Sequence, residues 1–275
     1  RSGAGNFLGI FFLCVIACFM VLPMVYAVGN SFKPMDELFK FPPTLLPNRW
    51  VTTNYTDLFV LMGNSWVPFS RYFFNTLFIT SLGTFGQIVF CSLCAYPLAM
   101  YNFPGSKFLS NLIKTALMFN GTVLWLPLFM IKAKLGMIDT YWAIIIPTFG
   151  APMGMYLMRQ FMSQIPKSLV EAARIDGAGS FKIFWSIVMP QVKSAWLTLM
   201  IFSVQNLWNL GASVFIQSES LKTLPYALNQ IVSTGIARQG VANAVTVIMM
   251  SVPIVTFIVS QSNIIVTMAT SGMKD

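Results

Sequence analysis

The chain lacks the side chains on which most catalytic sites depend. Its 275 residues include no histidine, which excludes Ser-His-Asp and Cys-His catalysis, imidazole metal ligands and histidine proton relays. The phosphate-binding pattern G-x-x-x-x-G-K-[ST] is also absent, so any ATP that is used must be bound by another subunit. Cys91 and Cys94 have C-x-x-C spacing, but without a second ligand pair they are interpreted as small apolar residues on a helix face. We therefore expect a chain that is not an enzyme and holds no cofactor or metal.

The interval 164–190 has the most informative spacing. Ser168 and Glu171 are placed as in a capping box, in which the hydroxyl of the first residue accepts the backbone N–H of the second. Gly177 can adopt the left-handed conformation that ends a helix. Pro190 can begin the next helix, because a residue in the first turn needs no backbone N–H. The spacing predicts two short helices joined by a tight turn, between two apolar segments.

Polar side chains recur at helical spacing near the end of the fifth apolar segment. They share one face of the predicted helix, namely Asn206, Asn209, Ser213 and Gln217, with Gln205 and Trp208 beside them. Amides hydrogen-bond to sugar hydroxyls, and an indole ring stacks on the apolar face of a pyranose. The pattern indicates a saccharide pathway, carried by Gln205, Asn206, Trp208, Asn209 and Ser213. The alternative is hydrogen bonding between packed helices.

Small polar residues in the second apolar segment favour helix packing over ligand binding. They are Thr76, Thr80, Thr84, Gln87 and Cys91. Weaker candidates for ligand contact in the third segment are Asn120 and Trp125, whereas packing is expected for Thr256, Ser260 and Asn263 in the sixth.

The composition places these groups inside a membrane. Hydrophobic residues make up 56% of the chain and charged residues 9%, whereas a soluble domain carries about 25% charged residues. Because a helix needs about 20 apolar residues to cross a bilayer, the charge-free runs predict six transmembrane helices in one all-α domain over residues 1–275. Their approximate bounds are 7–31, 72–100, 108–131, 140–160, 192–217 and 241–266.

The segments between the predicted spans do not determine on which side of the membrane the amino terminus lies. The segment 32–71 contains five prolines and is predicted to be an ordered loop outside the bilayer. With the amino terminus inside, nine Lys and Arg residues fall on the inner side and eight on the outer side, so charge alone leaves the orientation open. No A-x-A-like cleavage site follows the first span, so we expect this helix to be retained in the mature protein. Because position 1 is Arg, we expect the native amino terminus to be longer or processed.

The hairpin residues resemble the EAA loop of ABC-importer membrane subunits, whose pattern is EAA, a glycine and then I-x-LP. The matching residues are Glu171-Ala172-Ala173, Gly177, Ile187 and Met189-Pro190, with Met189 in place of the usual leucine, a volume-conserving change. The string Glu171–Ala178 is similar to the carbohydrate branch, the permeases like the second permease subunit of the maltose system. The resemblance extends over nearly the whole chain, through Ser31-Phe-Lys-Pro34, Phe41-Pro-Pro43, Leu46-Pro47, Phe74-Asn-Thr-Leu77, Arg159-Gln-Phe161 and Leu224-Pro225.

This resemblance implies the type I ABC-importer permease fold, with the amino terminus and the hairpin 164–190 in the cytoplasm and the loop 32–71 outside. It implies that the hairpin is the coupling helix that docks on an ATPase subunit. In that role Glu171 pairs with a basic residue or caps the helix, the alanines permit close approach, and Gly177 permits the turn. The implied coupling residues are Ser168, Glu171, Ala172, Ala173, Asp176 and Gly177. The tail 270–275 resembles one that reaches the ATPase dimer, the alternative being a frayed end.

We therefore expect a multi-pass permease subunit of a prokaryotic cell membrane that works by alternating access. The resemblance implies a homologous second permease subunit, two ATPase subunits that bind Mg-ATP, an extracellular solute-binding protein, lipid and a saccharide as partners, and no nucleic acid. In heterodimeric members the second subunit can hold most of the substrate contacts.

The charge of the loops and the scarcity of carboxylates in the spans help to choose between possible substrates and transporter classes. The predicted outer segments carry eight basic and five acidic residues, a net charge of +3. This favours an acidic oligosaccharide, such as an alginate- or pectin-type uronate, or else an acidic binding protein. One alternative is an ABC importer for a non-sugar solute such as a glycerol phosphate ester. Another is an ATP-independent channel or secondary transporter, which the scarcity of intramembrane carboxylates disfavours.

Overall fold

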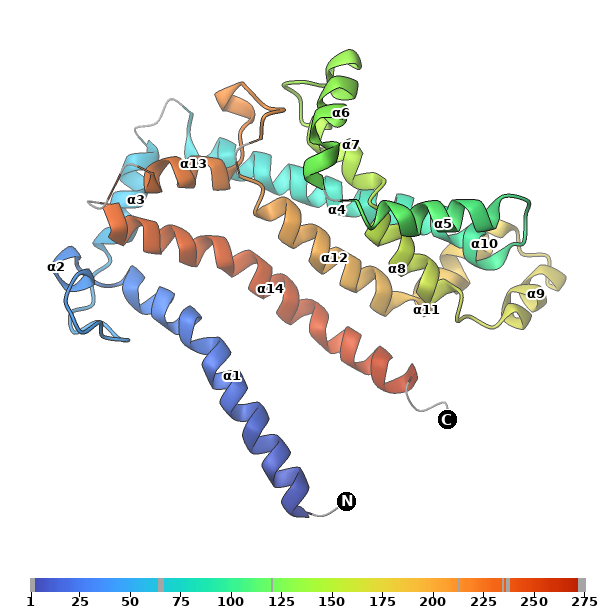
Figure 1. Cartoon of the computed structure of the whole chain (residues 1–275), viewed down its shortest axis with the longest axis horizontal. Coiled ribbons are helices and arrows are strands. Elements are labelled where there is room, and N and C mark those ends of the chain that lie inside the picture. The colour runs from blue at the N-terminus through green and yellow to red at the C-terminus, as the bar shows by residue number, and fades with distance from the viewer. Residues whose placement is uncertain are drawn as a thin grey trace. The chain divides into compact units, whose positions relative to one another are not determined.

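The computed structural model describes residues 3–63, 67–119, 121–211, 213–233, 235 and 238–271, and the regular elements in these ranges are helices, as the sequence predicts (Figure 1). The chain divides into two compact units. The first consists of Arg1–Phe69 and Pro225–Val252, and the second of Ser70–Leu224 and Pro253–Asp275.

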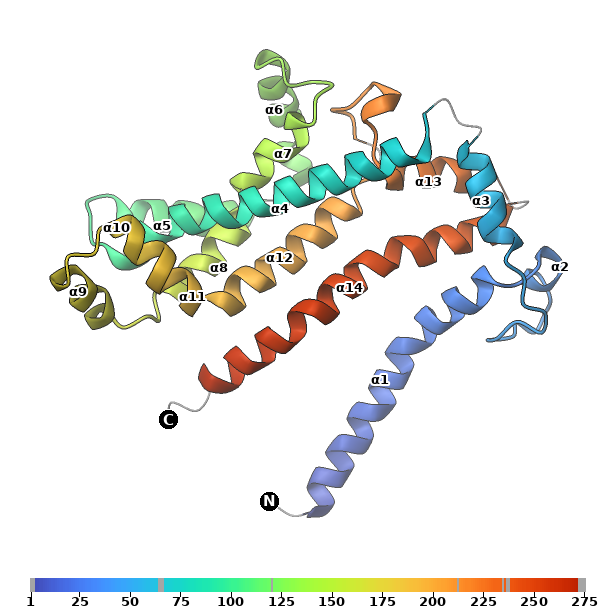
Figure 2. The same ribbon diagram turned by 180° about the vertical axis from the view of Figure 1, so that it is seen from behind.

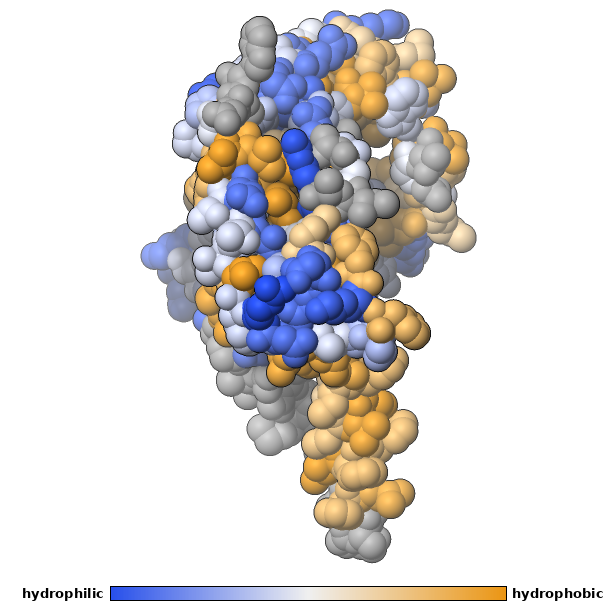
Figure 3. Space-filling view, turned by 90° about the vertical axis from the view of Figure 1, so that its left-hand side faces the viewer, coloured by the Kyte–Doolittle hydropathy of each residue, from blue (hydrophilic) through white to orange (hydrophobic). Residues whose placement is uncertain are grey.

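The first unit contains a long apolar helix, α1 (Gly3–Ser31). The unit also contains α2 (Met35–Leu38), α3 (Thr53–Gly63), nearly all of α13 (Leu224–Val232) and the first part of α14 (Gln239–Ser271). The large apolar side chains of α1 are exposed from Phe7 to Val28, as the orange surface at the bottom of Figure 3 shows. A helix of this length whose apolar side chains are exposed belongs in lipid.

Asn54 joins three parts of the first unit. Its side-chain amide donates to the backbone carbonyls of Ser31 and Lys33 at 2.8 and 2.9 Å. Gly240, near the start of α14, lies so close that a Cβ at this position would be 2.2 Å from Asn54 Oδ1. The absence of a side chain at Gly240 therefore allows α14 to approach α3.

Besides the second part of α14, the second unit contains the remaining helices. They are α4 (Phe69–Met100), α5 (Ser106–Ala116), α6 (Gly121–Lys134), α7 (Trp142–Phe149), α8 (Pro152–Met162), α9 (Lys167–Ile175), α10 (Ser180–Ile183), a π-helix (Phe184–Val188), α11 (Met189–Gln191), α12 (Lys193–Trp208) and a 3₁₀ turn (Glu219–Leu221). Figures 1 and 2 both show α12 running alongside α4.

Glycines bring the helices of the second unit into close contact. A Cβ on Gly83 of α4 would lie 2.6 Å from Leu207 of α12, and one on Gly86 would lie 2.0 Å from the ring of Phe149 of α7. Small residues at such contacts are typical of membrane helices, which associate through close packing. For Thr84, one of the residues of the second apolar segment, the predicted helix packing is confirmed, because its hydroxyl donates to that of Ser203 of α12 at 3.0 Å.

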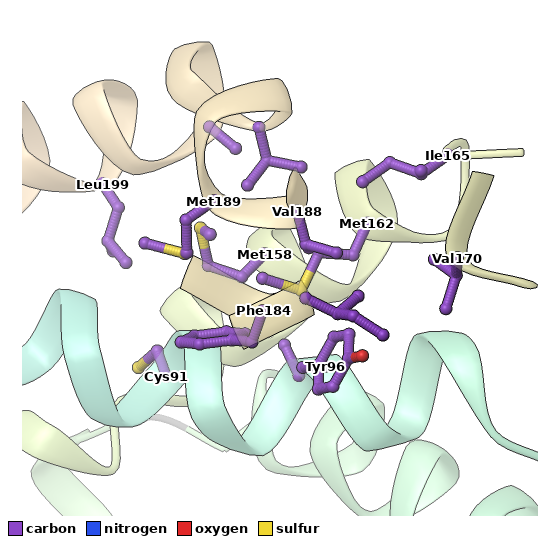
Figure 4. Packing of buried hydrophobic residues seen from close by; sticks show 14 of the residues in the cluster. Cys91, Tyr96, Met158, Met162, Ile165, Val170, Phe184, Val188, Met189 and Leu199 are labelled. Carbon is purple, nitrogen blue, oxygen red and sulfur yellow. The ribbon is translucent and has the colours of Figure 1, made fainter. Parts of the chain in front are cut away.

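An apolar core connects the end of α4 to α8, α9 and the π-helix (Figure 4). Its members include Cys91 and Tyr96 of α4, Met158 of α8, Val170 of α9 and Phe184 of the π-helix. The buried thiol of Cys91 takes part in this packing, in agreement with its interpretation as a small apolar residue.

Three helices are long and apolar enough to cross a membrane, counting only the described residues. They are Phe7–Ser31, Phe69–Met100 and Gln239–Gln261, and they fall on the first, second and sixth predicted spans. A bent pair, Ser180–Gln191 and Lys193–Trp208, can make a fourth. The count of six remains a prediction.

The other predicted spans are interrupted. The range 108–131 is shared between α5 and α6, and the range 140–160 between α7 and α8. The second break lies at Ala151, which has an extended ψ of 118°. Ala151 precedes Pro152, and the ring of a proline disfavours helical backbone angles at the residue before it. The helix predicted over 192–217 ends at Trp208.

Candidate functional site

The amino-terminal end of the hairpin helix differs from the prediction. Helix α9 begins at Lys167, and Pro166 precedes it with an extended ψ of 127° and no side-chain cap. Ser168 therefore lies within the first helical turn, whereas a capping residue must have non-helical backbone angles. The predicted capping box of Ser168 and Glu171 is wrong, because Pro166 starts the helix earlier.

The carboxy-terminal end of α9 is as predicted. Gly177 has φ of +80°. The N–H of Ala178 donates to the carbonyl of Ala173, and that of Gly177 to Arg174, both at 3.0 Å. These two bonds form a Schellman motif, which satisfies carbonyls that the helix end would leave unpaired.

The hairpin has an inner and an outer side. Val170 and Ala173 are buried in the apolar core of the second unit. Ile175 is 87% exposed and Phe181 is 70% exposed. The other residues predicted to couple to an ATPase lie at the surface, and they are Ser168, Glu171, Ala172, Asp176 and Gly177. Of the predicted set only Ala173 faces the core.

Aromatic residues attach the hairpin to the end of α4. The guanidinium of Arg174 lies 5.0 Å from the ring centroid of Tyr101, and the hydroxyl of Tyr101 donates to Ser180 Oγ at 3.5 Å. Tyr101 also meets Tyr96 edge to face, with the ring centroids 5.7 Å apart. This contact was not predicted from the sequence, although Arg174 in the last turn of a short helix and an aromatic residue directly after a span are both visible there.

A sharp bend follows the hairpin. In the π-helix the N–H of Met189 donates to the carbonyl of Phe184. Pro190 then has no N–H to donate, and α12 starts only after Val192, at 78° to the preceding helical segment. The indole N–H of Trp196 donates to the carbonyl of Met189 at 3.3 Å. The prediction that Pro190 begins the fifth span is wrong, since the helix restarts at Lys193.

A cavity of about 500 Å³ opens beside this bend, between α4 and α12. Its lining is mainly apolar and includes Phe85, Trp185, Met189, Trp196 and Met200. Such a surface offers few hydrogen-bonding groups to a sugar.

The residues predicted to line a saccharide pathway do not all lie on one helical face. Gln205 and Asn206 are exposed on α12, and Asn209 follows the helix, with its amide donating to the carbonyl of Gln205 at 2.8 Å. Ser213 lies in irregular chain, so the single helical face predicted from Asn206 to Gln217 is wrong. Trp208 is 1% exposed. Its ring is packed among other side chains and is not placed to stack on a sugar. Asn120 lies outside the described residues.

Asn75 holds the segment beyond α12 against α4 and α7. Its side chain is fully buried, and its amide donates to the carbonyls of Ser220 and Lys222 at 2.8 and 2.9 Å. Its side-chain oxygen accepts the hydroxyl of Tyr141 at 2.7 Å. The neighbouring Thr76 accepts the N–H of Leu224 at 2.7 Å. The amide of Asn75 is therefore fully used inside the protein.

Asp139 makes a second attachment to the same segment. Its carboxylate accepts the N–H groups of Gln217 and Ser218 at 3.0 and 2.8 Å, as well as the hydroxyl of Ser218. The hydroxyl and N–H of Ser218 hold the pKa of Asp139 below its usual value. The connection between α6 and α7 is thus fixed to the chain that follows α12.

Comparison with known proteins identifies the family. Residues 87–263 match the family described as binding-protein-dependent transport system inner membrane component. The arabinooligosaccharides transport system permease protein AraQ of Halalkalibacterium halodurans is 30% identical over 271 residues, which is 97% of this chain and 95% of that protein. The sn-glycerol-3-phosphate transport system permease protein UgpE of Yersinia enterocolitica is 30% identical over 199 residues, which is 72% of this chain and 71% of that protein.

A solved structure has the same fold. It is described as a bacterial ABC transporter involved in the import of the acidic polysaccharide alginate, and it matches with a TM-score of 0.80 over 95% of this chain and 98% of that chain, at 24% identity. The chain therefore belongs to the family of binding-protein-dependent transport system inner membrane components. It is a membrane-embedded permease subunit, a transport component.

Proposed function

We propose that this chain is one of two permease subunits of an ATP-driven importer for oligosaccharides, that it has six membrane spans, and that it works by alternating access. Its partners in this proposal are a homologous second permease, two ATPase subunits that bind Mg-ATP, and an extracellular solute-binding protein. In this proposal the chain forms part of the path that the substrate takes through the membrane, and it catalyses no reaction.

The exposed side of the α9–α10 hairpin carries this proposal. Ile175 and Phe181 are large, apolar and mostly exposed, and they lie on the short helices α9 and α10, outside the three single helices that are long enough to span a membrane. Exposed apolar side chains at such a place mark a protein contact. Glu171, Ala172 and Gly177 lie next to them in the pattern typical of ATPase docking.

The inner side of the hairpin supports transmission of movement. Val170 packs in the same core as Phe184 and Tyr96, so a displaced hairpin must displace the π-helix or the end of α4. Close-packed cores transmit such displacements because they deform little. The 78° bend before α12 is a place where the angle between two helices can change.

The substrate class is proposed from relatives and charge. One relative is named for arabinooligosaccharides and another for sn-glycerol-3-phosphate. The net charge of +3 on the predicted outer segments favours an acidic oligosaccharide over a neutral one. Gln205, Asn206, Asn209 and Ser213 are the proposed polar contacts in this chain. Import of a glycerol phosphate ester is the second candidate, because it is also anionic and is supported by the second relative.

Purification in mild detergent followed by mass spectrometry tests the transport assignment. We expect a second permease, an ATPase and a solute-binding protein to co-purify. The complex in liposomes is then assayed for ATP hydrolysis stimulated by the binding protein with oligogalacturonate, arabino-oligosaccharide or sn-glycerol-3-phosphate. A chain that purifies alone, without an ATPase, would contradict the importer assignment. Stimulation by arabino-oligosaccharide alone would retain the importer and reject the acidic substrate.

A further inference from the structure

The loop that follows α2 exposes apolar side chains to its surroundings. Phe41 is 93% exposed, and Phe39, Leu45 and Leu46 are each more than half exposed. The sequence 38–47 contains one charged residue, Lys40, and no acidic residue. Contiguous exposed apolar residues of this kind mark a contact with a partner or a membrane.

Buried polar bonds fix the backbone of this loop. The ammonium group of Lys33 is buried and donates to Asn30 Oδ1 at 2.7 Å and to the carbonyl of Thr44 at 2.5 Å. The carboxylate of Glu37 accepts the N–H of Asn48 at 2.7 Å. The charges of Lys33 and Glu37 are thus directed into the structure, while the apolar side chains at 39, 41, 45 and 46 remain exposed.

The loop folds back along the end of α1. A Cβ on Gly29 would lie 2.5 Å from the carbonyl oxygen of Leu45, so the backbone of Leu45 rests on α1 two residues before that helix ends. Val25 and Tyr26, one turn earlier on α1, are also exposed. The apolar surface of α1 and that of the loop are therefore adjacent.

The length of α1 places this junction at the membrane surface. The apolar stretch Phe7–Ser31 has 25 residues. At 1.5 Å per residue such a helix is about 37 Å long, which exceeds the hydrocarbon thickness of about 30 Å by about one turn. The last turn of α1, against which Leu45 rests, then lies at the level of the lipid headgroups.

We propose that residues 39–46 form a membrane-interface anchor, in which Phe39, Phe41, Leu45 and Leu46 enter the boundary between headgroups and acyl chains. Phe and Leu are typical of the apolar faces of interfacial segments, which are buried by about 5–10 Å at this boundary. Lys40 between the two phenylalanines is placed to meet lipid phosphates. The anchor requires membrane insertion of α1 only, so it does not rest on the proposed transport function.

Depth-dependent fluorescence quenching tests the anchor. The cysteines at 14, 18, 91 and 94 are replaced by alanine, and Phe41→Cys is labelled with an environment-sensitive fluorophore in phosphatidylcholine nanodiscs. We expect lipids with a doxyl group near the headgroup to quench this probe several-fold more strongly than one at Asp57→Cys on α3, and aqueous iodide to quench it several-fold less. A Leu46→Cys probe repeats the measurement in case the first variant does not fold.

The outcomes separate lipid from other surroundings. Probes at positions 41 and 46 that iodide quenches as strongly as the probe at 57 would overturn the proposal. Probes shielded from iodide but not quenched by doxyl lipid would also overturn it, because a protein would then cover the loop. Adding Lys33→Met to the Phe41→Cys chain should reduce lipid quenching, since the loop loses the bond from Lys33 to Thr44. None of these readouts depends on transport.

Discussion

The indole N–H of Trp196 donates to the carbonyl oxygen of Met189 at 3.3 Å, across the bend between the hairpin segment and α12. Trp196→Phe keeps an aromatic ring and removes the donor. We expect a loss of stability of about 0.5–1.5 kcal/mol, the usual worth of one hydrogen bond, and a broader distribution of bend angles. Spin labels on α10 and α12 measure that distribution. Trp185→Phe on the same cavity is the matched control, and equal broadening in both variants would contradict the role of the bond.

Gly177→Ala and Gly179→Ala form a second test, because the two glycines lie in one turn. Gly177 has φ of +80°, where a side chain costs about 1–2 kcal/mol. Gly179 has φ of −68°, and no atom lies within 4 Å of the position that a Cβ would occupy. We expect Gly177→Ala to weaken coupling between ATP hydrolysis and transport, Gly177→Leu to abolish it without preventing membrane insertion, and Gly179→Ala to behave as the wild type. Normal transport per ATP by Gly177→Leu would reject the coupling role.

Asn75→Ala tests the attachment of the segment beyond α12. It removes the bonds that the Asn75 side chain makes to the carbonyls of Ser220 and Lys222 and to the hydroxyl of Tyr141. A buried group left unpaired costs about 1–3 kcal/mol, so we expect lower thermal stability and faster proteolysis near Ser220. Tyr141→Phe removes one of the three bonds and should have a smaller effect. Equal melting temperatures for Asn75→Ala and the wild type would show that these bonds contribute little.

Glu37 predicts a dependence of stability on pH. The N–H of Asn48, then that of Arg49 and the nearby lysines, hold the pKa of Glu37 below the ordinary value for a glutamate. A lowered folded-state pKa contributes stability above the unfolded-state value, and this contribution is lost as the pH falls through the folded-state value. The melting temperature of the wild type should therefore fall more steeply below pH 4.5 than that of Glu37→Gln. Parallel curves for the two chains would contradict this assignment.

Gly86→Ala tests the contact between α4 and α7. Its Cβ would lie 2.0 Å from the ring of Phe149, so the ring must move. Overpacking of this kind costs about 1–3 kcal/mol, and Phe149→Leu in the same chain should recover part of the loss. Gly9→Ala in α1, where no atom lies within 4 Å, is the control and should not lower stability. Unfolding in detergent, followed by tryptophan fluorescence, gives the comparison.

The sequence predicts those features that depend on local composition. Long apolar runs give the positions of α1, α4 and α14, and Gly177 ends α9 where its freedom of backbone rotation indicates. The resemblance to the EAA loop was sufficient to suggest the family. The start of α9 could have been placed correctly, because Pro166 already excludes an earlier helical N–H bond.

The features that were missed depend on contacts between distant residues. Apolar periodicity continues past Trp208, so the end of α12 and the burial of its indole are decided by packing that the pattern does not contain. Asn75 binds Ser220 and Lys222, which lie 145 and 147 positions further along the chain. The motif around Asn75 could be noticed only through resemblance, and its partners could not be named. The attachment of Tyr101 to Arg174 has the same origin.

Helix α4 is attached near both of its ends, to different parts of the second unit. Its 32 residues extend over about 48 Å at 1.5 Å per residue. Asn75 binds the chain beyond α12 near one end, and Tyr101 contacts the hairpin just past the other. If α4 moves as one body, a partner bound at the hairpin and a ligand that contacts the segment held by Asn75 share a single coupling free energy. By reciprocity, the factor by which ATPase docking changes ligand affinity must equal the factor by which the ligand changes docking.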